Sequence, residues 1–71
     1  MELDAAIVSA YVEIDTPADR LVLHREFGDR FVELVGRKTE RPIMREQALE
    51  RLITLRKLGR LPRLRRNRRS A

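Results

Sequence analysis

The sequence predicts an all-α fold, a small three-helix bundle followed by a basic C-terminal tail. Apolar residues recur at helical spacing in three segments, at about residues 3–14, 17–35 and 44–58. Start and stop signals for helices separate these segments, and no Gly-Ser linker divides the chain. With 71 residues, 42% of them hydrophobic, the chain has enough material for one small core.

The first segment, residues 3–14, carries two apolar strips. The first strip consists of Leu3, Ile7, Ala10, Tyr11 and Ile14. The second strip consists of Ala5, Val8 and Val12. A helix with two apolar strips needs contacts on two of its sides. The β-branched residues also allow a strand over residues 6–14, but the helical spacing favours a helix.

The second segment opens with the clearest helix start in the chain. Thr16 supplies an N-cap hydroxyl, and Pro17 suits the first helical position. Apolar side chains then fall on one half of the helical wheel, and Gly36 supplies a left-handed stop. Gly28 lies on the apolar half, where we expect close approach of a neighbouring helix rather than a break. His24 lies there too, which indicates a buried structural histidine.

The third segment follows a polar connection over residues 37–43 that contains Pro42. Its apolar stripe consists of Ala48, Leu49, Leu52, Ile53 and Leu55. Gly59 and Pro62 then end the helix. We therefore expect a helical domain over residues 1–61 and an arginine-rich tail over residues 62–71.

Charge is divided unevenly along the chain. Residues 1–40 hold five Lys/Arg against nine Asp/Glu, whereas residues 41–71 hold eleven against two. Arginine forks match phosphate oxygens, and the release of counterions from a nucleic acid gives affinity without sequence selectivity. The sequence therefore predicts a small nucleic-acid-binding protein, with DNA and RNA both left open as the partner.

The predicted contact residues are cations of the third segment and of the chain that follows it. They are Arg45, Arg51, Lys57, Arg60, Arg63, Arg65, Arg66, Arg68 and Arg69. A helix-turn-helix-like DNA-binding regulator is one form that such a protein takes, with Gln47 and Thr54 on the outward face of the third helix. Glu46 and Glu50 lie on the same face and oppose phosphate binding there.

Catalytic and metal-binding functions find little support in the sequence. The chain has one histidine and no cysteine, and its serines Ser9 and Ser70 lie in no catalytic motif. We therefore expect no enzyme activity, no cofactor and no metal site. The longest mostly apolar run, residues 5–12, is too short to span a membrane. A cytoplasmic location follows as the expectation, and a membrane partner is not expected.

An alternative function belongs to a different class. The second apolar strip of the first segment fits a helical protein-protein interaction or adaptor module that dimerises through this helix. A domain of this size gains from such support, because its own core is small.

Overall fold

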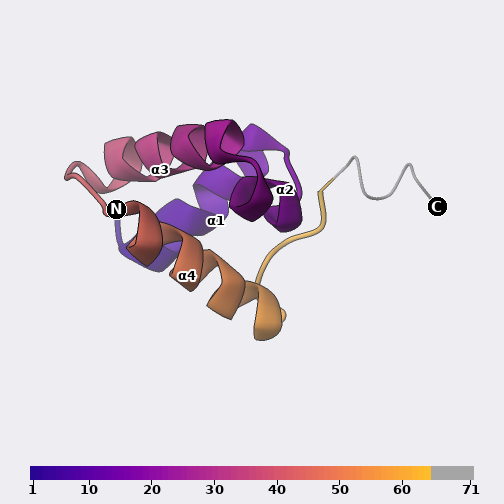
Figure 1. The fold of residues 1–71 in the computed structure, drawn as a ribbon. Coiled ribbons are helices and arrows are strands. Elements are labelled where there is room, and N and C mark those ends of the chain that lie inside the picture. Colours follow the sequence, from indigo (N-terminus) through magenta and orange to yellow (C-terminus); the bar gives the residue numbers. More distant parts are fainter. Residues whose placement is uncertain (65–71) are drawn as a thin grey trace.

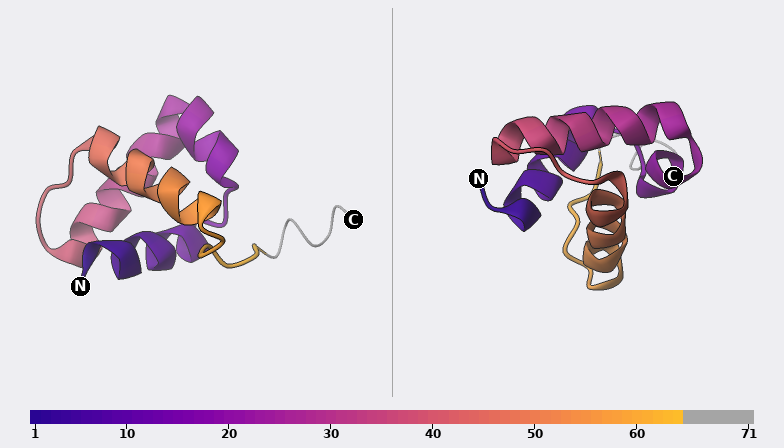
Figure 2. Two further views of the ribbon diagram at one scale, coloured as in Figure 1. Left: turned by 90° about the horizontal axis from the view of Figure 1, so that it is seen from below. Right: turned by 60° about the vertical axis from the view of Figure 1, so that its left-hand side comes forward.

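The computed structural model describes residues 1–64, which form four helices and no strand. The helices are α1 (Leu3–Ile14), α2 (Ala18–Leu23), α3 (Arg25–Thr39) and α4 (Arg45–Lys57). The all-α prediction is confirmed, and the strand alternative for residues 6–14 is wrong. In Figure 1, α3 lies along the top with α1 beneath it, α2 lies at the right-hand end, and α4 lies at the bottom. The second view of Figure 2 shows α4 pointing away from α3 instead of running alongside it.

The first helix has the bounds that its apolar spacing predicts. Ile7, Ala10 and Tyr11 are buried, so the first apolar strip faces the core. The helix ends at Asp15, which adopts a left-handed conformation with φ of 51° and donates its N–H to the Tyr11 carbonyl. Aspartate tolerates this conformation better than most residues, because its short polar side chain can hydrogen-bond locally.

The single helix predicted for residues 17–35 is two helices in the structure. His24 takes an extended conformation, with φ of −104° and ψ of 109°, and separates α2 from α3. This break changes the rotational phase of the chain, so the apolar stripe does not continue through it. His24 is exposed rather than buried, and the neighbouring Leu23 is 79% exposed. The prediction of a buried structural histidine is therefore wrong.

The third helix also runs past its predicted stop. Gly36 lies inside α3, which continues to Thr39 and ends at Glu40, a left-handed residue with φ of 61°. The Arg41 N–H donates to the Gly36 carbonyl at 3.2 Å, and the Thr39 hydroxyl donates to the same carbonyl at 3.1 Å. A glycine permits a left-handed cap but does not require one, and here the additional turn finds its own hydrogen bonds.

Gly28 marks the close approach of α2 and α3. A Cβ atom at this position would lie 2.6 Å from the Leu21 carbonyl oxygen and 3.2 Å from Nη2 of Arg45. The prediction that Gly28 serves close packing is confirmed, because no larger residue leaves the Leu21 carbonyl in place. The break falls four residues earlier, at His24.

The core draws on all four helices and on the start of the arginine-rich tail. The largest fully buried side chains are Phe31, Ile7, Leu21, Leu52, Leu55 and Val35. Leu64 joins them with 2% of its surface exposed. The packed part of the protein thus reaches three residues beyond the expected domain boundary at residue 61.

Candidate nucleic-acid interface

Three arginines of α4 are engaged in ion pairs with the other three helices. Arg45 pairs with Asp29 of α3, and Arg56 pairs with Asp19 of α2. Arg51 donates from Nε and Nη2 to the two carboxylate oxygens of Asp4 in α1, at 2.6 and 2.7 Å. Each neighbouring helix thus supplies one aspartate to α4. Arg45 and Arg51, two of the predicted contact residues, lie in these pairs.

The pair between Arg51 and Asp4 has the best-defined geometry of the three. Its two parallel hydrogen bonds form the fork that arginine makes with a carboxylate. The hydrogen bonds from Arg51 hold the pKa of Asp4 below its ordinary value of 3.8, against the opposing effect of partial burial. The positive charges of Arg51 and Arg60 lower this pKa further. Arg51 is therefore committed to an internal carboxylate.

The cations after Arg56 are arranged differently. Lys57, Arg60 and Arg63 are exposed, and none of them forms an ion pair with another residue between positions 1 and 64. The remaining predicted contact residues, Arg65, Arg66, Arg68 and Arg69, lie outside the described residues.

The local backbone explains why the cations near the end of α4 stay at the surface. Gly59 adopts φ of +70°, which ends the helix in a left-handed turn. The Gly59 N–H donates to the Arg56 carbonyl, and the Arg60 N–H donates to the Leu55 carbonyl at 2.9 Å. The chain then turns back, and Leu64 enters the core.

The start of the arginine-rich tail lies against the junction of α1 and α2. Leu61, Pro62 and Arg63 line a hollow together with Tyr11, Pro17, Ala18, Asp19 and Arg56. Figure 1 shows the chain between the end of α4 and residue 64 rising toward the side of the molecule where α2 lies. Residues 61–63 thus lie beside the start of α2, and Leu64 is buried directly after them.

The exposed face of α4 does not resemble a surface for reading DNA. Glu46 and Glu50 are exposed there beside Gln47 and Thr54, and no described ion pair neutralises either glutamate. Phosphates would be repelled by both carboxylates. Arg51 lines the same hollow as these glutamates, and Lys57 follows Thr54 by about one helical turn, so two predicted cations share this face with two carboxylates.

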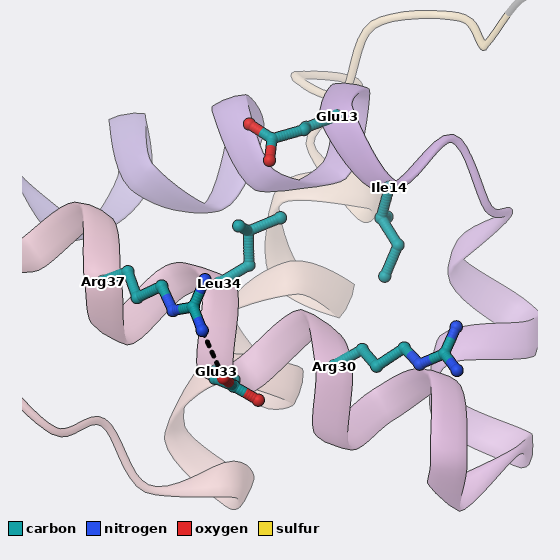
Figure 3. Close-up of a pocket in the computed structure, with 6 residues that line it drawn as sticks. All are labelled: Glu13, Ile14, Arg30, Glu33, Leu34 and Arg37. Carbon is teal, nitrogen blue, oxygen red and sulfur yellow. Dashed lines mark hydrogen bonds and ion pairs between the residues drawn. The ribbon is translucent and has the colours of Figure 1, made fainter.

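A groove between α1 and α3 has an apolar floor and a charged rim. Ile14 and Leu34 point into it, as Figure 3 shows, and charged residues surround them. Arg37 pairs with Glu33 at 2.8 Å across the rim, while Arg30 points away from that pair. The rim carries equal numbers of acidic and basic side chains, so it favours neither an anion nor a cation.

The described aromatic side chains offer no platform for stacking bases. Tyr11 and Phe31 are buried, and Phe27 is partly buried with its ring edge-on to His24 at 5.7 Å. Burial also raises the pKa of the Tyr11 hydroxyl, which keeps it neutral. Binding through residues 1–64 would therefore rest on phosphate contacts rather than on base stacking.

The residues considered for catalysis and metal binding are the one histidine and the acidic side chains. His24 is exposed, and its one ring contact is with Phe27. No group of three histidine, cysteine, aspartate or glutamate side chains in this stretch of the chain could hold a metal ion. None of the helices described for this stretch has the length and apolar composition needed to cross a membrane.

Comparison with models of protein families, with characterised proteins and with solved structures finds no match to this chain.

Leu64 falls within the expected tail, where its apolar side chain marks it as able to dock on the core, and in the structure it is a core residue. Sequence reasoning missed one cation near this surface. Arg20 is an exposed cation of α2 with no ion pair in the described part of the chain. Its position in the acidic half of the sequence concealed it.

Proposed function

We propose that this chain is a small nucleic-acid-binding protein that contacts phosphates through the end of α4 and the arginine-rich tail. One observation carries the proposal. The cations Lys57, Arg60 and Arg63 have no ion pair within residues 1–64, whereas Arg45, Arg51 and Arg56 of the same region all do. The four arginines that follow Leu64 in the sequence extend the cluster without adding a carboxylate.

The contact set is therefore narrower than charge alone suggests. It comprises Lys57, Arg60, Arg63, Arg65, Arg66, Arg68 and Arg69. Arg45 and Arg51 instead hold α4 against α3 and α1. The Asp4 carboxylate uses two of the five N–H donors of Arg51 and neutralises its charge, so a phosphate contact there would contribute less than one made by an arginine without an ion pair.

Seven phosphate contacts give a strongly salt-dependent affinity. Each contact adds about 0.9 to the slope of log K against log salt concentration on duplex DNA, so the full set gives a slope of up to about 6 in magnitude. Binding of this kind carries little sequence information, because phosphates are the same at every base pair.

The experiment compares two variants that each remove three positive charges. One replaces Arg63, Arg65 and Arg66 by alanine, and the control replaces Arg25, Arg30 and Arg37. Both are titrated into a labelled 20-base-pair duplex and a structured RNA over a series of salt concentrations, with heparin as a reference polyanion. We expect the tail variant to lose about 3 units of slope and the control to lose much less. Equal losses, or no salt-dependent binding by the wild type, would refute the proposal.

Shortened proteins need care, because Leu64 is part of the core. A chain that ends after Pro62 loses a buried leucine together with the arginines, so weak binding would have two explanations. A chain that ends after Leu64 keeps this side chain and removes Arg65, Arg66, Arg68 and Arg69. The second form is the appropriate tail-less control.

A helical interaction module remains the second candidate, and one observation favours it. Val12 is 52% exposed and Ala5 is exposed, so the second apolar strip of α1 is partly open to solvent. A dimer through this strip would be disrupted by Val12→Glu, with Val22→Glu on α2 as the matched control. Light scattering measures the mass of each protein in solution and so distinguishes a monomer from a dimer. The candidate fails if the wild type is a monomer, or if Val12→Glu leaves the mass of a wild-type dimer unchanged.

A further inference from the structure

We infer that the phosphate contacts continue from the arginine-rich tail onto α2 through Arg20. This inference rests on the proposed function and adds a residue from the acid-rich half of the sequence. It makes the interface a surface formed by two distant segments of the chain.

Pro17 connects the two segments in space. Arg20 lines a hollow with Thr16, Pro17 and Phe27. Arg63 lines a second hollow, which Pro17 also borders. Arg20 and Arg63, 43 positions apart in the sequence, thus each line a hollow that Pro17 borders.

The charges around Pro17 leave Arg20 available. Arg20 is exposed and forms no ion pair with any residue of the described chain. Two carboxylates lie in this region. Asp19 is engaged by Arg56, and Asp15 lies close enough to the Tyr11 hydroxyl to act on it electrostatically. The positive charges of Arg20 and Arg63 are therefore not cancelled by Asp19.

The last described residues of the chain lie close to this region. Because Leu64 is buried and Arg63 borders the hollow at Pro17, the chain leaves the described residues beside the start of α2. Arg65 and Arg66 follow directly in the sequence. Each strand of duplex DNA carries one negative charge per about 3.4 Å of the helix axis, so one strand offers several phosphates to cations on neighbouring parts of this surface.

The experiment is a pair of single substitutions with the same change in charge. Arg20→Ala removes the inferred contact, and Arg30→Ala removes an exposed arginine of α3 that pairs with Glu26. Arg20→Lys keeps the positive charge. Each full-length variant is titrated into the labelled 20-base-pair duplex over a series of salt concentrations, and thermal unfolding by circular dichroism checks that each is folded.

We expect Arg20→Ala to reduce the magnitude of the slope of log K against log salt concentration by about 0.9, the value of one phosphate contact. Arg30→Ala and Arg20→Lys should leave the slope close to that of the wild type. Equal slopes for Arg20→Ala and Arg30→Ala would overturn the inference while leaving the tail as the binding element. If the wild type itself shows no salt-dependent binding to the duplex, the proposed function is overturned instead.

Discussion

Replacement of Gly28 by alanine tests the packing of α2 on α3. The new Cβ atom would lie 2.6 Å from the Leu21 carbonyl oxygen, a separation that real Cβ atoms do not adopt. Because this oxygen belongs to the backbone, α2 has to shift as a unit. Overpacking of this kind costs about 1–3 kcal/mol, while alanine in place of glycine within a helix contributes about 1 kcal/mol in the opposite direction. The net loss is then up to about 2 kcal/mol.

Gly36 provides a matched control in the same helix. A Cβ atom there would have the Arg41 carbonyl oxygen as its nearest contact, at an ordinary 3.4 Å. Gly36→Ala should therefore keep the gain of about 1 kcal/mol that alanine brings to a helix. Since the gain is common to both variants, the difference between them measures the clash at Gly28 alone.

The assay is thermal unfolding followed by circular dichroism, supported by urea titration. A domain of this size shifts its Tm by about 4–8 °C per kcal/mol. We expect Gly28→Ala to melt at least 4 °C below Gly36→Ala by this conversion. If Gly28→Ala proves as stable as Gly36→Ala, the close approach of the Leu21 carbonyl to α3 is not a feature of the folded protein.

Two further predictions concern the ends of the chain. Because the pKa of Asp4 is lowered in the folded state, its stabilisation is present above the ordinary value of 3.8 and is lost as the pH falls through the lower folded value. The Tm gap between the wild type and Asp4→Asn should close below pH 3.8, and a gap independent of pH would contradict this cause. Leu64→Ala should lose about 2–5 kcal/mol in urea unfolding, whereas a loss as small as that of exposed Leu58→Ala would show that Leu64 is not in the core.

Periodicity was enough to predict the helical fold and the bounds of α1, since the stripe of Leu3, Ile7 and Tyr11 is the buried face. It was not enough to find the break at His24. Leu23 continues the apolar pattern, so the sequence offers no polar interruption there, yet Leu23 is exposed. The structure shows a contact that accompanies the break, because the Leu21 carbonyl of α2 lies against Gly28 of α3.

The candidate site was predicted less completely, because a count of charges does not show which carboxylates lie nearby. The predicted contacts Arg45 and Arg51 are paired with Asp29 and Asp4, residues 16 and 47 positions away. Pairing at such separations depends on the packing of the helices. Arg20 was missed for a different reason, since it lies in the half of the sequence where carboxylates outnumber cations.

The position of a basic residue relative to the buried stripe of its helix shows whether it forms an ion pair with a neighbouring helix or remains an exposed cation. The number of charges along the sequence does not show this. At about 100° per residue, Arg45, Arg51 and Arg56 all lie within about 75° of the middle of the stripe formed by Ala48, Leu52 and Leu55, whereas Lys57 lies nearly opposite. Side chains at the flanks of a buried stripe meet the neighbouring helices, and here each finds an aspartate.

The three pairs change the charge that each half of the chain presents. When the six residues of these pairs are left out of the count, residues 1–40 hold five cations and six carboxylates. Residues 41–71 then hold eight cations and two carboxylates. The acidic half is then close to neutral, at −1, while the basic half keeps +6, and the two add to the net charge of +5. The excess lies mostly beyond Arg56, so a polyanion would be drawn to the end of α4 and the tail, and the rest of the surface would do little to repel it.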